Sequence, residues 1–541
     1  MRKPITVLVS VDSNSVLLGA RHFKNYLVDR LAYYNLTELV DVLETGSLGR
    51  YDRGVLFLVL PDNTLYGIKN TNDIDRFVEE QLLKGRPVKD LAVEEVKTPK
   101  SVEAKKVTEE ERIVLKRAGK INPRNIEEYI ALDGYQSLAK ALKMRPEEII
   151  AEIKESGLRG RGGAGFPTGL KWEFTMKVNA PEKFVICNAD EGEPGTFKDR
   201  LIMEGDPHSV IEGMLIAGYA VGANKGYVYI RGEYYESVDN LRTAISQAYE
   251  YGLLGDNILG SGFSFDLTVR LGAGAYVCGE ETALIESIEG KAGRPRLKPP
   301  YPPVKGLFQK PTVVNNVETF ASVPAILLNG SNWFKSIGTP SSPGTKVFSL
   351  CGNLVRRGIV EAPMGTTVAD LIYKYGGGIE GGKKLKMVQT GGAAGTFIKA
   401  EEISAPMDFD SFKTHGASLG SGVILAIDDS HCAVDVALNL MEFFAHESCG
   451  KCTPCREGTR LIVNMLKEFS KGRGSHEMLD NLYNVAYTMQ NSAFCGLGQS
   501  VPVPLTSLLD RFRDEFEAHI DALECPSGVC KFEKKKKKTK R

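Results

Sequence analysis

Short apolar runs and stretches of helical periodicity alternate along the first part of the chain. Ile5–Ser10 and Val55–Leu60 are apolar runs of strand length, bounded by polar and turn-forming residues. His22–Tyr33 and Asp73–Leu83 repeat apolar residues at helical spacing. This pattern predicts a small α/β unit over residues 1–95.

The same alternation continues on a larger scale in the middle of the chain. A helical pattern at Pro146–Ile153 is followed by strand-like runs at Phe184–Cys187, Tyr227–Arg231 and Phe265–Arg270. Strands that alternate with helices are typical of an α/β domain. The family resemblance described below places this domain at residues 115–340.

Two further segments have a different pattern. Lys97–Arg112 is charged and aperiodic, which predicts a linker with bounds at residues 96–114. Residues 431–524 place apolar and charged residues at helical spacing almost throughout, which predicts a helical domain.

Bulk composition excludes several classes of protein. The 541 residues suffice for three or four domains of about 150 residues each. Lysine plus arginine equals aspartate plus glutamate at 68 each, so charge indicates neither nucleic acid nor an anionic membrane as a partner. The longest apolar run is far short of the roughly 20 residues of a membrane span. Because Met1–Pro4 leads directly into a strand-like run, we expect no signal peptide and a cytoplasmic protein with reduced thiols.

Three of the ten cysteines fall within seven residues. Cys449, Cys452 and Cys455 are separated by two residues each, and Cys495 follows Cys455 by 40 positions. Three closely spaced thiolates and a distant fourth are a typical ligand set for an iron–sulfur cluster. Four cysteines also suit tetrahedral zinc, but structural zinc sites usually pair their ligands as two C-x₂-C knuckles. The spacing favours an iron–sulfur cluster, with zinc as the alternative.

A glycine-rich segment, Gly157–Pro167, follows the helical pattern at Pro146–Ile153. Glycines let the backbone approach a ligand and present N–H groups to a phosphate, and Arg159 and Arg161 add positive charge. The segment departs from the Rossmann fingerprint because it follows a helix instead of a strand. By itself it does not separate a nucleotide site from a plain loop.

Acidic and amide side chains follow the predicted strands of the same domain. Asn188–Gly195 comes after the first strand, Gly272–Leu284 again combines strand, turn and helix, and Thr312–Thr319 ends the series. Between them, Arg294–Pro303 is a proline-stiffened loop with cationic and aromatic side chains. Ligands of open α/β sheets bind at the carboxyl ends of the strands. Each stretch alone is better explained as a solvated turn, so their value lies in their order along the chain.

The ordered series from Gly157 to Thr319, followed by Ser448–Arg456 and Cys495, closely resembles the NADH-binding, FMN-carrying subunit of respiratory complex I. Its relatives include subunits of soluble NAD-linked hydrogenases and formate dehydrogenases, some of which bifurcate electrons. The resemblance covers roughly residues 115–525. It implies a multi-domain α/β fold with a Rossmann-like FMN and NADH domain, a ubiquitin-like β-grasp domain at 341–430, and a four-helix bundle at 431–524 that holds a [4Fe–4S] cluster.

The resemblance also implies which residues bind the cofactors. The residues expected to cradle the FMN phosphate are Arg159, Gly160, Gly162, Gly163, Gly165 and Lys171. Those expected to hold the ribityl chain and ring are Asn188, Asp190, Glu191, Gly279, Asn315 and Asn316, with Val314 and Glu280 in the same cofactor-binding set. For the dinucleotide, the residues expected to sandwich the adenine are Phe166, Phe174 and Tyr301. The expected contacts of ribose, nicotinamide and phosphates are Glu193, Tyr276, Glu281 and Lys298.

No acid–base catalyst is expected, because hydride transfer from nicotinamide to a flavin needs none and the chain shows no Ser/His/Asp constellation. Glu191 and Glu193 are expected to lie near the flavin. A flavin accepts a hydride and passes electrons on singly, so it can connect NADH to a one-electron cluster. Glu281 beside the adenosine ribose would repel a 2′-phosphate, which favours NAD over NADP. The family often has phenylalanine where Tyr301 stands, and tyrosine preserves the stacking.

Residues 1–95 resemble the thioredoxin-like [2Fe–2S] domain of some flavoprotein subunits, whose ligands are arranged as C-x₄-C and C-x₃-C. The corresponding positions here are Ser10, Ser15, Ser47 and Tyr51. Hydroxyl groups do not replace thiolates as ligands of iron, so we expect a degenerate domain without a cluster that serves in docking.

Two further features lie near the C-terminus, within residues 525–541: a pair of cysteines and a lysine-rich end. Cys525 and Cys530 follow the predicted bundle, and His519 lies six residues before Cys525. These three residues could bind zinc with Cys432 as a fourth ligand, or the cysteines could be vestigial free thiols. The lysine-rich end is expected to be solvated and disordered, a contact with an acidic partner being the less favoured explanation.

The sequence therefore predicts the flavoprotein subunit of a soluble multi-subunit oxidoreductase of hydrogenase, formate dehydrogenase or transhydrogenase type. Electrons would pass between NAD(H), FMN and a single [4Fe–4S] cluster, and zinc is a further candidate cofactor. The expected partners are a [2Fe–2S] thioredoxin-like subunit and a further iron–sulfur or catalytic subunit, in a hetero-oligomer. The alternative is a non-catalytic, metal-stapled scaffold subunit with a vestigial nucleotide site.

Overall fold

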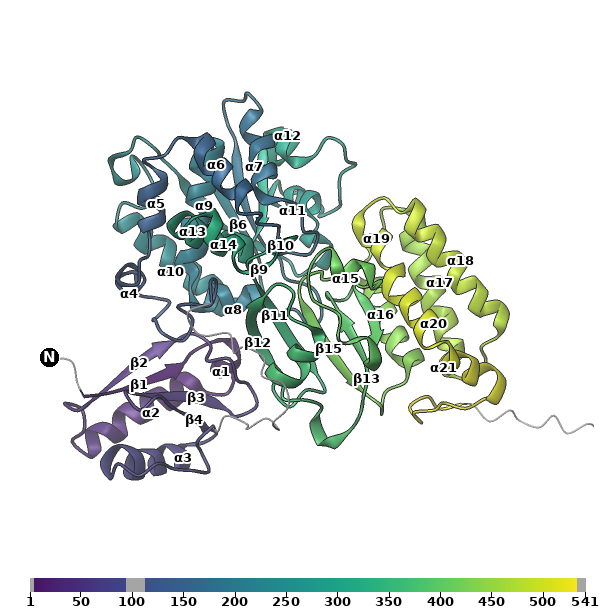
Figure 1. Ribbon diagram of the computed structural model, residues 1–541, viewed down its shortest axis with the longest axis horizontal. Helices are drawn as coiled ribbons and strands as arrows, with labels where there is room; N and C mark the ends of the chain where they lie inside the picture. The colour runs from purple at the N-terminus through teal and green to yellow at the C-terminus, as the bar shows by residue number, and fades with distance from the viewer. Residues whose placement is uncertain (1–3, 94–111, 533–541) are drawn as a thin grey trace, which may run out of the picture.

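The computed structural model describes residues 4–93 and 112–532, which form a mixed α/β protein of four successive units (Figure 1). The first two units each contain a four-stranded sheet, the third contains a five-stranded sheet, and the fourth is helical. In Figure 1 the third unit (green) contacts both the second unit and the C-terminal helices (yellow). The linker predicted at 96–114 and the lysine-rich end fall mainly on 94–111 and 533–541, outside the described residues.

The N-terminal unit is a sheet of order β2-β1-β3-β4 covered by helices. Its strands are β1 (Ile5–Ser10), β2 (Val40–Thr45), β3 (Val55–Leu60) and β4 (Thr64–Ile68). β1 pairs parallel with β2, whereas the other two pairings are antiparallel. Its helices are α1 (Ser13–Leu17), α2 (Ala20–Tyr33) and α3 (Thr71–Arg76), which continues as a helical turn over Phe77–Leu83. Phe23, Leu27 and Leu31 recur at four-residue spacing on α2, so one face of that helix is buried in the core of this unit.

The second unit contains a fully parallel sheet of order β7-β6-β5-β8. Its strands are β5 (Phe184–Ala189), β6 (Lys225–Arg231), β7 (Asp266–Gly272) and β8 (Thr312–Asn316). Its main helices are α4 (Ile126–Ala131), α5 (Gln136–Ala141), α6 (Pro146–Glu155), α7 (Thr168–Lys177), α8 (Lys198–Gly205), α9 (Pro207–Val221), α10 (Tyr235–Glu250), α11 (Glu281–Ile288), α12 (Pro302–Lys305), α13 (Val317–Asn329) and α14 (Ser331–Lys335).

Helix α9 is the centre of this unit, because nearly all of its residues are buried. It packs closely on α13: a Cβ atom at Gly213 would lie 2.1 Å from the carbonyl oxygen of Phe320. Only glycine permits this approach of the two helices. Since all four strands run parallel, their carboxyl ends lie at one edge of the sheet, which positions the site described below.

The third unit is a mixed sheet of order β12-β11-β15-β13-β14. Its strands are β11 (Thr345–Gly352), β12 (Gly358–Pro363), β13 (Leu385–Thr390), β14 (Thr396–Lys399) and β15 (Val423–Asp428). Only the central pair β11 and β15 is parallel among these neighbours. The short strands β9 (Gly338–Thr339) and β10 (Ser342–Pro343) precede this sheet, and α15 (Ser411–Thr414) lies before β15.

The C-terminal unit packs four long helices together, α16 (Ala433–Glu447), α17 (Thr453–Ser470), α18 (His476–Ser492) and α20 (Pro502–Arg511). The short helices α19 (Gly496–Ser500) and α21 (Arg513–Glu517) flank α20. Ile462, Leu466 and Phe469 form the buried stripe of α17 at helical spacing. No helix within residues 4–93 and 112–532 combines the length and apolar character that a membrane span requires.

Candidate cofactor sites

A cleft opens at the carboxyl edge of the parallel sheet in the second unit. Asn188 lies near the end of β5 and Asn316 ends β8, and the glycine-rich segment forms another part of the wall. Predicted site residues that line the cleft are Gly162, Gly163, Asn188, Asp190, Glu191, Glu193, Tyr276, Gly279, Glu280 and Asn316. The parallel topology therefore brings together side chains that are up to 154 positions apart in the sequence.

The glycine-rich segment presents backbone to the cleft. Gly160 donates its N–H to the Phe166 carbonyl oxygen at 2.9 Å, so the segment folds back on itself. Gly163 has a φ of +141°, a conformation that L side chains rarely adopt. A Cβ atom at Gly162 would lie 3.0 Å from the Cβ of Asn316, so the chain runs close to the end of β8. Such a wall suits the approach of a phosphate or another group that needs N–H donors.

The two arginines of this segment are held away from the cleft. Arg161 is buried and donates to the carbonyl oxygens of Pro343 at 2.8 Å and Thr345 at 3.0 Å, both at the edge of the third unit. Arg159 forms an ion pair with Asp410 at 3.2 Å and does not line the cleft. Both guanidinium groups thus join the second unit to the third. The positive charge that the sequence suggested for a phosphate lies elsewhere in this structure.

Five acidic residues line the cleft, namely Asp190, Glu191, Glu193, Asp199 and Glu280. Asp190 Oδ2 is buried and has no hydrogen-bond partner within the described chain, and burial raises the pKa of this carboxyl to about 7. Burial, reinforced by the neighbouring Asp199, also raises the pKa of Glu191, although the N–H groups of Asp199 and Arg200 donate to it at 3.0 Å. An unpaired buried acceptor costs free energy unless a ligand supplies a donor. The unpartnered Oδ2 therefore indicates a ligand with N–H or O–H groups.

The third unit completes the cleft through Glu193. Its carboxylate accepts a hydrogen bond from the Ser421 hydroxyl at 2.7 Å and from the Ala394 N–H at 3.4 Å. Gly391 and Gly420 line the cleft as well. Sequence analysis did not predict this contribution of the third unit, and the glycines at 391, 392, 420 and 422 are the signal that could have indicated it.

The residues expected to bind the adenine half of a dinucleotide lie outside the cleft lining. Phe166, Phe174 and Tyr301 are 43%, 45% and 55% exposed, so their rings are accessible to a stacking ligand. Lys298 pairs with Glu280 at 2.8 Å and with Glu281 at 3.5 Å.

The walls of the cleft are supported from the protein interior by Lys171, Val314 and Asn315. Lys171 donates to the Val314 carbonyl oxygen at 2.8 Å and lies 3.7 Å from a carboxylate oxygen of Glu281. Asn315 is buried and accepts a hydrogen bond from the Trp172 indole N–H at 2.9 Å. Asn315 and Val314 therefore hold β8 and α7 together and do not line the cleft.

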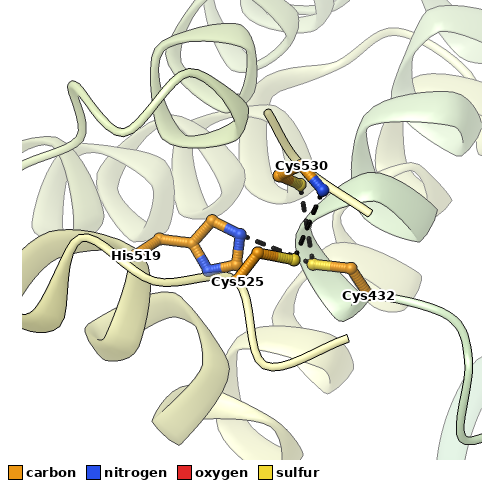
Figure 2. Close-up of side chains that lie close together, drawn as sticks. All are labelled: Cys432, His519, Cys525 and Cys530. Atoms are coloured by element: carbon orange, nitrogen blue, oxygen red, sulfur yellow. Dashed lines mark hydrogen bonds between the residues drawn. The ribbon is translucent and has the colours of Figure 1, made fainter. Parts of the chain in front are cut away.

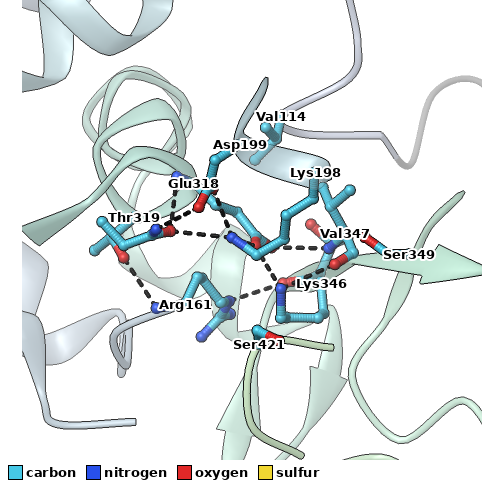
Figure 3. A network of polar contacts seen from close by, with 12 residues as sticks. Val114, Arg161, Lys198, Asp199, Glu318, Thr319, Lys346, Val347, Ser349 and Ser421 are labelled. Carbon is cyan, nitrogen blue, oxygen red and sulfur yellow. Dashed lines mark hydrogen bonds and ion pairs between the residues drawn. The ribbon is translucent and has the colours of Figure 1, made fainter. Parts of the chain in front are cut away.

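Lys198 and Asp199 are cleft residues that sequence analysis missed. They begin α8 and are buried, and they pair with each other at 2.6 Å (Figure 3). Their signal in the sequence was weak, because adjacent opposite charges at a predicted helix start normally lie on the surface.

The four cysteines of the predicted cluster site meet around one cavity. Cys452 and Cys495 lie at the N-termini of α17 and α19. Together with Cys449 and Cys455 they line the cavity. Burial, together with the three neighbouring thiols, raises the pKa of Cys455 to about 11. Helix N-termini stabilise thiolates, which are the form that binds metal.

The spacing of these sulfurs separates the two metal alternatives. Around one tetrahedral zinc ion, thiolate sulfurs lie about 3.8 Å apart, given Zn–S bonds of about 2.3 Å. Within the described chain, ligand groups whose atoms all lie within 4.8 Å of one another include Cys432, His519, Cys525 and Cys530, but not the four cysteines around this cavity. A wider arrangement fits a cluster of several irons better than a single ion.

Cys432, His519, Cys525 and Cys530 form a second, tighter group (Figure 2). Cys432 Sγ lies 3.6 Å from His519 Nε2 and 3.8 Å from Cys530 Sγ. The contact with Cys530 is the main cause that lowers the pKa of Cys432, and it raises that of Cys530. His519 Nδ1 contacts the Glu515 carbonyl oxygen at 2.7 Å, which leaves Nε2 directed at the sulfurs. Three thiols and one imidazole in this arrangement are a suitable tetrahedral zinc ligand set.

Two protein-family descriptions match the chain at these sites. The Nuo51 FMN-binding domain matches residues 153–325, and the NADH-ubiquinone oxidoreductase-F iron–sulfur binding region matches residues 435–519. HndC, a subunit of an NADP-reducing hydrogenase from Solidesulfovibrio fructosivorans, is 49% identical over 77% of this chain and 85% of its own length. A subunit of an NADH-quinone oxidoreductase from Rhizobium meliloti is 50% identical over 74% of this chain and 95% of its own length. The chain belongs to the family of FMN-binding, iron–sulfur subunits of NADH oxidoreductases.

A solved structure extends the family likeness across nearly the whole chain. The NAD⁺-reducing [NiFe]-hydrogenase in its H₂-reduced state matches with a TM-score of 0.67 and 31% identity, over 96% of this chain and 85% of that chain. The FMN-binding region coincides with the glycine-rich wall, the acidic cleft and β8, and the iron–sulfur region with the helices around Cys449, Cys452 and Cys455. Family membership thus supports the cluster over zinc at these cysteines.

Proposed function

We propose that this chain is the catalytic flavoprotein subunit of a multi-subunit oxidoreductase, with NAD(H) as its substrate. FMN, when bound, exchanges a hydride with the nicotinamide and passes electrons on singly. The residues of the chain orient the two cofactors: the glycine-rich wall with Asn188, Asp190 and Asn316 would hold FMN. Phe166, Phe174 and Tyr301 would stack on the adenine. Electrons would leave through one [4Fe–4S] cluster at Cys449, Cys452, Cys455 and Cys495.

The observation that carries this proposal is the shared wall of the two sites. Val277 and Leu497 line both the acidic cleft and the cysteine cavity. The two cavities therefore adjoin each other at these two apolar side chains. A cofactor in the cleft and a cluster at the cysteines would be direct neighbours, as one-electron transfer between them requires.

The test is anaerobic titration of the purified full chain with NADH. We expect flavin absorbance that bleaches on addition of NADH, about four irons per chain, and NADH-driven reduction of a viologen dye. A chain that holds zinc instead of iron at the cysteine cavity would refute the cluster. A chain without flavin and without NADH-driven dye reduction would refute the catalytic function and favour the metal-stapled scaffold.

For the N-terminal unit we propose a thioredoxin-like fold whose cluster site has become a polar contact region. The positions of the missing ligands are joined in pairs by hydrogen bonds, Ser10 to Ser15 and Ser47 to Tyr51, each at 2.8 Å. Beside them, the N–H of Ser13 donates to Glu204 of α8 at 3.0 Å. Hydroxyl pairs that satisfy one another leave no free ligand for iron. We propose that this unit serves in docking, and that its first docking surface is the second unit of the same chain.

For the third and fourth units we propose the β-grasp and four-helix-bundle assignments over 341–430 and 431–524. The mixed sheet around β11 and β15, and the packing of α16, α17, α18 and α20, support these assignments. The FMN and NADH domain would then span 115–340.

We further propose that Cys432, His519, Cys525 and Cys530 bind one structural zinc ion. The site would fasten residues after α21 to the start of α16, because its ligands come from both segments. Zinc analysis of the purified chain is the direct test: one zinc per chain supports the site, and iron alone would refute it.

The electron path of this chain requires partners, for which we propose a [2Fe–2S] thioredoxin-like subunit and a further iron–sulfur or catalytic subunit. The complex would be of hydrogenase, formate dehydrogenase or transhydrogenase type, with electron bifurcation as one possible mode. We propose a cytoplasmic setting, where clustered cysteines stay reduced and can bind metal. Mass spectrometry of the native complex would identify the co-purifying chains and test this assignment.

A further inference from the structure

A buried group of charges joins α8 and α13 of the second unit to β11 of the third unit (Figure 3). Its members are Lys198 and Asp199 of α8, Glu318 of α13 and Lys346 of β11, and their side chains are at most 5% exposed. Glu318 pairs with both lysines, at 3.0 Å from Lys198, and also accepts the Val347 N–H at 2.8 Å. Two lysines and two acidic side chains therefore share a space from which water is excluded, and burial lowers the pKa of Lys346 to about 7.

Lys198 is fully occupied by acceptors from three different elements. Its Nζ lies 2.6 Å from Asp199, 3.0 Å from Glu318 and 3.2 Å from Asn316 Oδ1. Asp199 in turn accepts from Asn316 Nδ2 at 2.6 Å. Both ends of the Asn316 amide are thus fixed by the Lys198–Asp199 pair, which determines the orientation of this amide at the cleft.

A ligand in the cleft interacts most strongly with the charges that line the cleft. Lys198 and Asp199 line the cleft, whereas Lys346 does not. Burial alone would lower the pKa of Lys198, but Asp199 and Glu318 outweigh it and raise this pKa, so the lysine stays charged throughout the neutral range. In a water-poor site, a fixed charge acts on a neighbouring cofactor far more strongly than it would in bulk solvent.

We propose that the Lys198–Asp199 pair sets the midpoint potential of FMN in this cleft, with the lysine raising the potential and the aspartate lowering it. This inference rests on the proposed function and deepens it. Reduction of FMN adds negative charge, which a nearby ammonium group stabilises and a nearby carboxylate opposes. Lys198 is a positioning residue in this view, because its donors are all used within the protein and it acts through charge and through Asn316.

The test measures the FMN midpoint potential by anaerobic spectroelectrochemical titration of flavin absorbance in the full chain. Lys198→Met should move the potential to more negative values, and Asp199→Asn should move it to more positive values. We expect at least a tenfold change in the preference for reduced over oxidised FMN in each case, or about 30 mV for a two-electron couple. The double variant should return toward the wild-type value.

Lys346→Met is the matched control. It removes an amino group from the same buried cluster, paired with the same Glu318, but away from the cleft. It should lower the stability of the fold and leave the potential unchanged. If Lys198→Met fails to fold, the positive shift of Asp199→Asn and its reversal in the double variant still test the proposal.

Three outcomes would overturn the inference: potentials that do not move, shifts of the same sign in both single variants, or an equal shift in Lys346→Met. A common sign would indicate general damage to the cleft and no specific electrostatic effect. These outcomes differ from failure of the proposed function, in which the wild-type chain itself would hold no FMN, and that result would refute both proposals.

Discussion

The unpaired carboxylate of Asp190 predicts a specific dependence of stability on pH. Burial raises the pKa of Asp190 in the folded chain from 3.8 to about 7. The unfolded chain loses this proton above about pH 4, whereas the folded chain keeps it until about pH 7, so ionisation opposes folding as the pH rises. At about 1.4 kcal/mol per pH unit, the cost is at most about 4 kcal/mol in the flavin-free protein.

Asp190→Asn removes this titration and keeps the shape of the protonated acid. In the flavin-free chain, the variant should be more stable than the wild type at pH 8, and the gap should narrow as the pH falls toward 5. About 2.5 kcal/mol of the difference lies in that interval. The physical reason is that the wild type must ionise a buried group that has no donor for its Oδ2.

Tryptophan fluorescence during urea unfolding is a suitable assay. The chain has two tryptophans, Trp172 and Trp333, and both lie in the second unit on α7 and α14. Their signal therefore reports on the unit that contains Asp190. Asp239→Asn, at an exposed position on α10, is the control for the substitution itself. A stability gap that is constant with pH, or that closes as the pH rises, would refute the reasoning.

Four further outcomes test other parts of the molecule. Cys455→Ser should leave NADH-dependent bleaching of FMN intact but abolish NADH-driven reduction of the partner cluster, measured by electron paramagnetic resonance. Retained reduction of the partner cluster would contradict the proposal that electrons leave this chain through one cluster. Glu281→Lys should raise the ratio of kcat/KM for NADPH to that for NADH by tenfold or more, and an unchanged ratio would argue against the ribose assignment. Cys525→Ser should lose the zinc that elemental analysis detects and lower the unfolding temperature, whereas unchanged zinc content would exclude this ligand. Gly46→Val should detach the N-terminal unit, because a Cβ atom there would lie 2.7 Å from the Cα of Gly205, and faster limited proteolysis near residues 94–111 would report it.

Much of the local structure could be predicted because it depends on local periodicity. Ile5–Ser10 and Val55–Leu60 are strands with the predicted bounds, and the helix predicted from Pro146 begins at that residue. Asn188 and Asp190 follow a strand-like run in the sequence, and the rule for the carboxyl ends of α/β sheets then predicted that they would lie at a ligand site. Those inferences need only the neighbours of each residue along the chain.

The parts that could not be predicted depend on contacts between distant segments. Arg161 was interpreted as a charge for a phosphate, but its guanidinium group is used by carbonyl oxygens of the third unit. Ser421 reaches Glu193 across 228 positions, and Lys346 reaches Glu318 from a different sheet. A glycine-rich motif predicts that the backbone closely approaches a ligand or another part of the protein. It does not predict which side chains of the motif face the ligand and which face the protein.

The arrangement of charge explains why these distant contacts matter for function. Asp190 and Glu191 are carboxyl groups whose ionisation is opposed by burial, and both line the cleft. The apolar helix α9 and its close packing against α13 lie in the core of the same unit and supply stabilisation that does not depend on the cleft residues. The cleft can therefore retain buried carboxyl groups that lack a hydrogen-bond donor or repel one another. A bound cofactor would supply the missing donors. On this argument, neutralising Asp190 stabilises the empty protein and weakens its hold on the cofactor, so stability and cofactor binding respond in opposite directions at this residue.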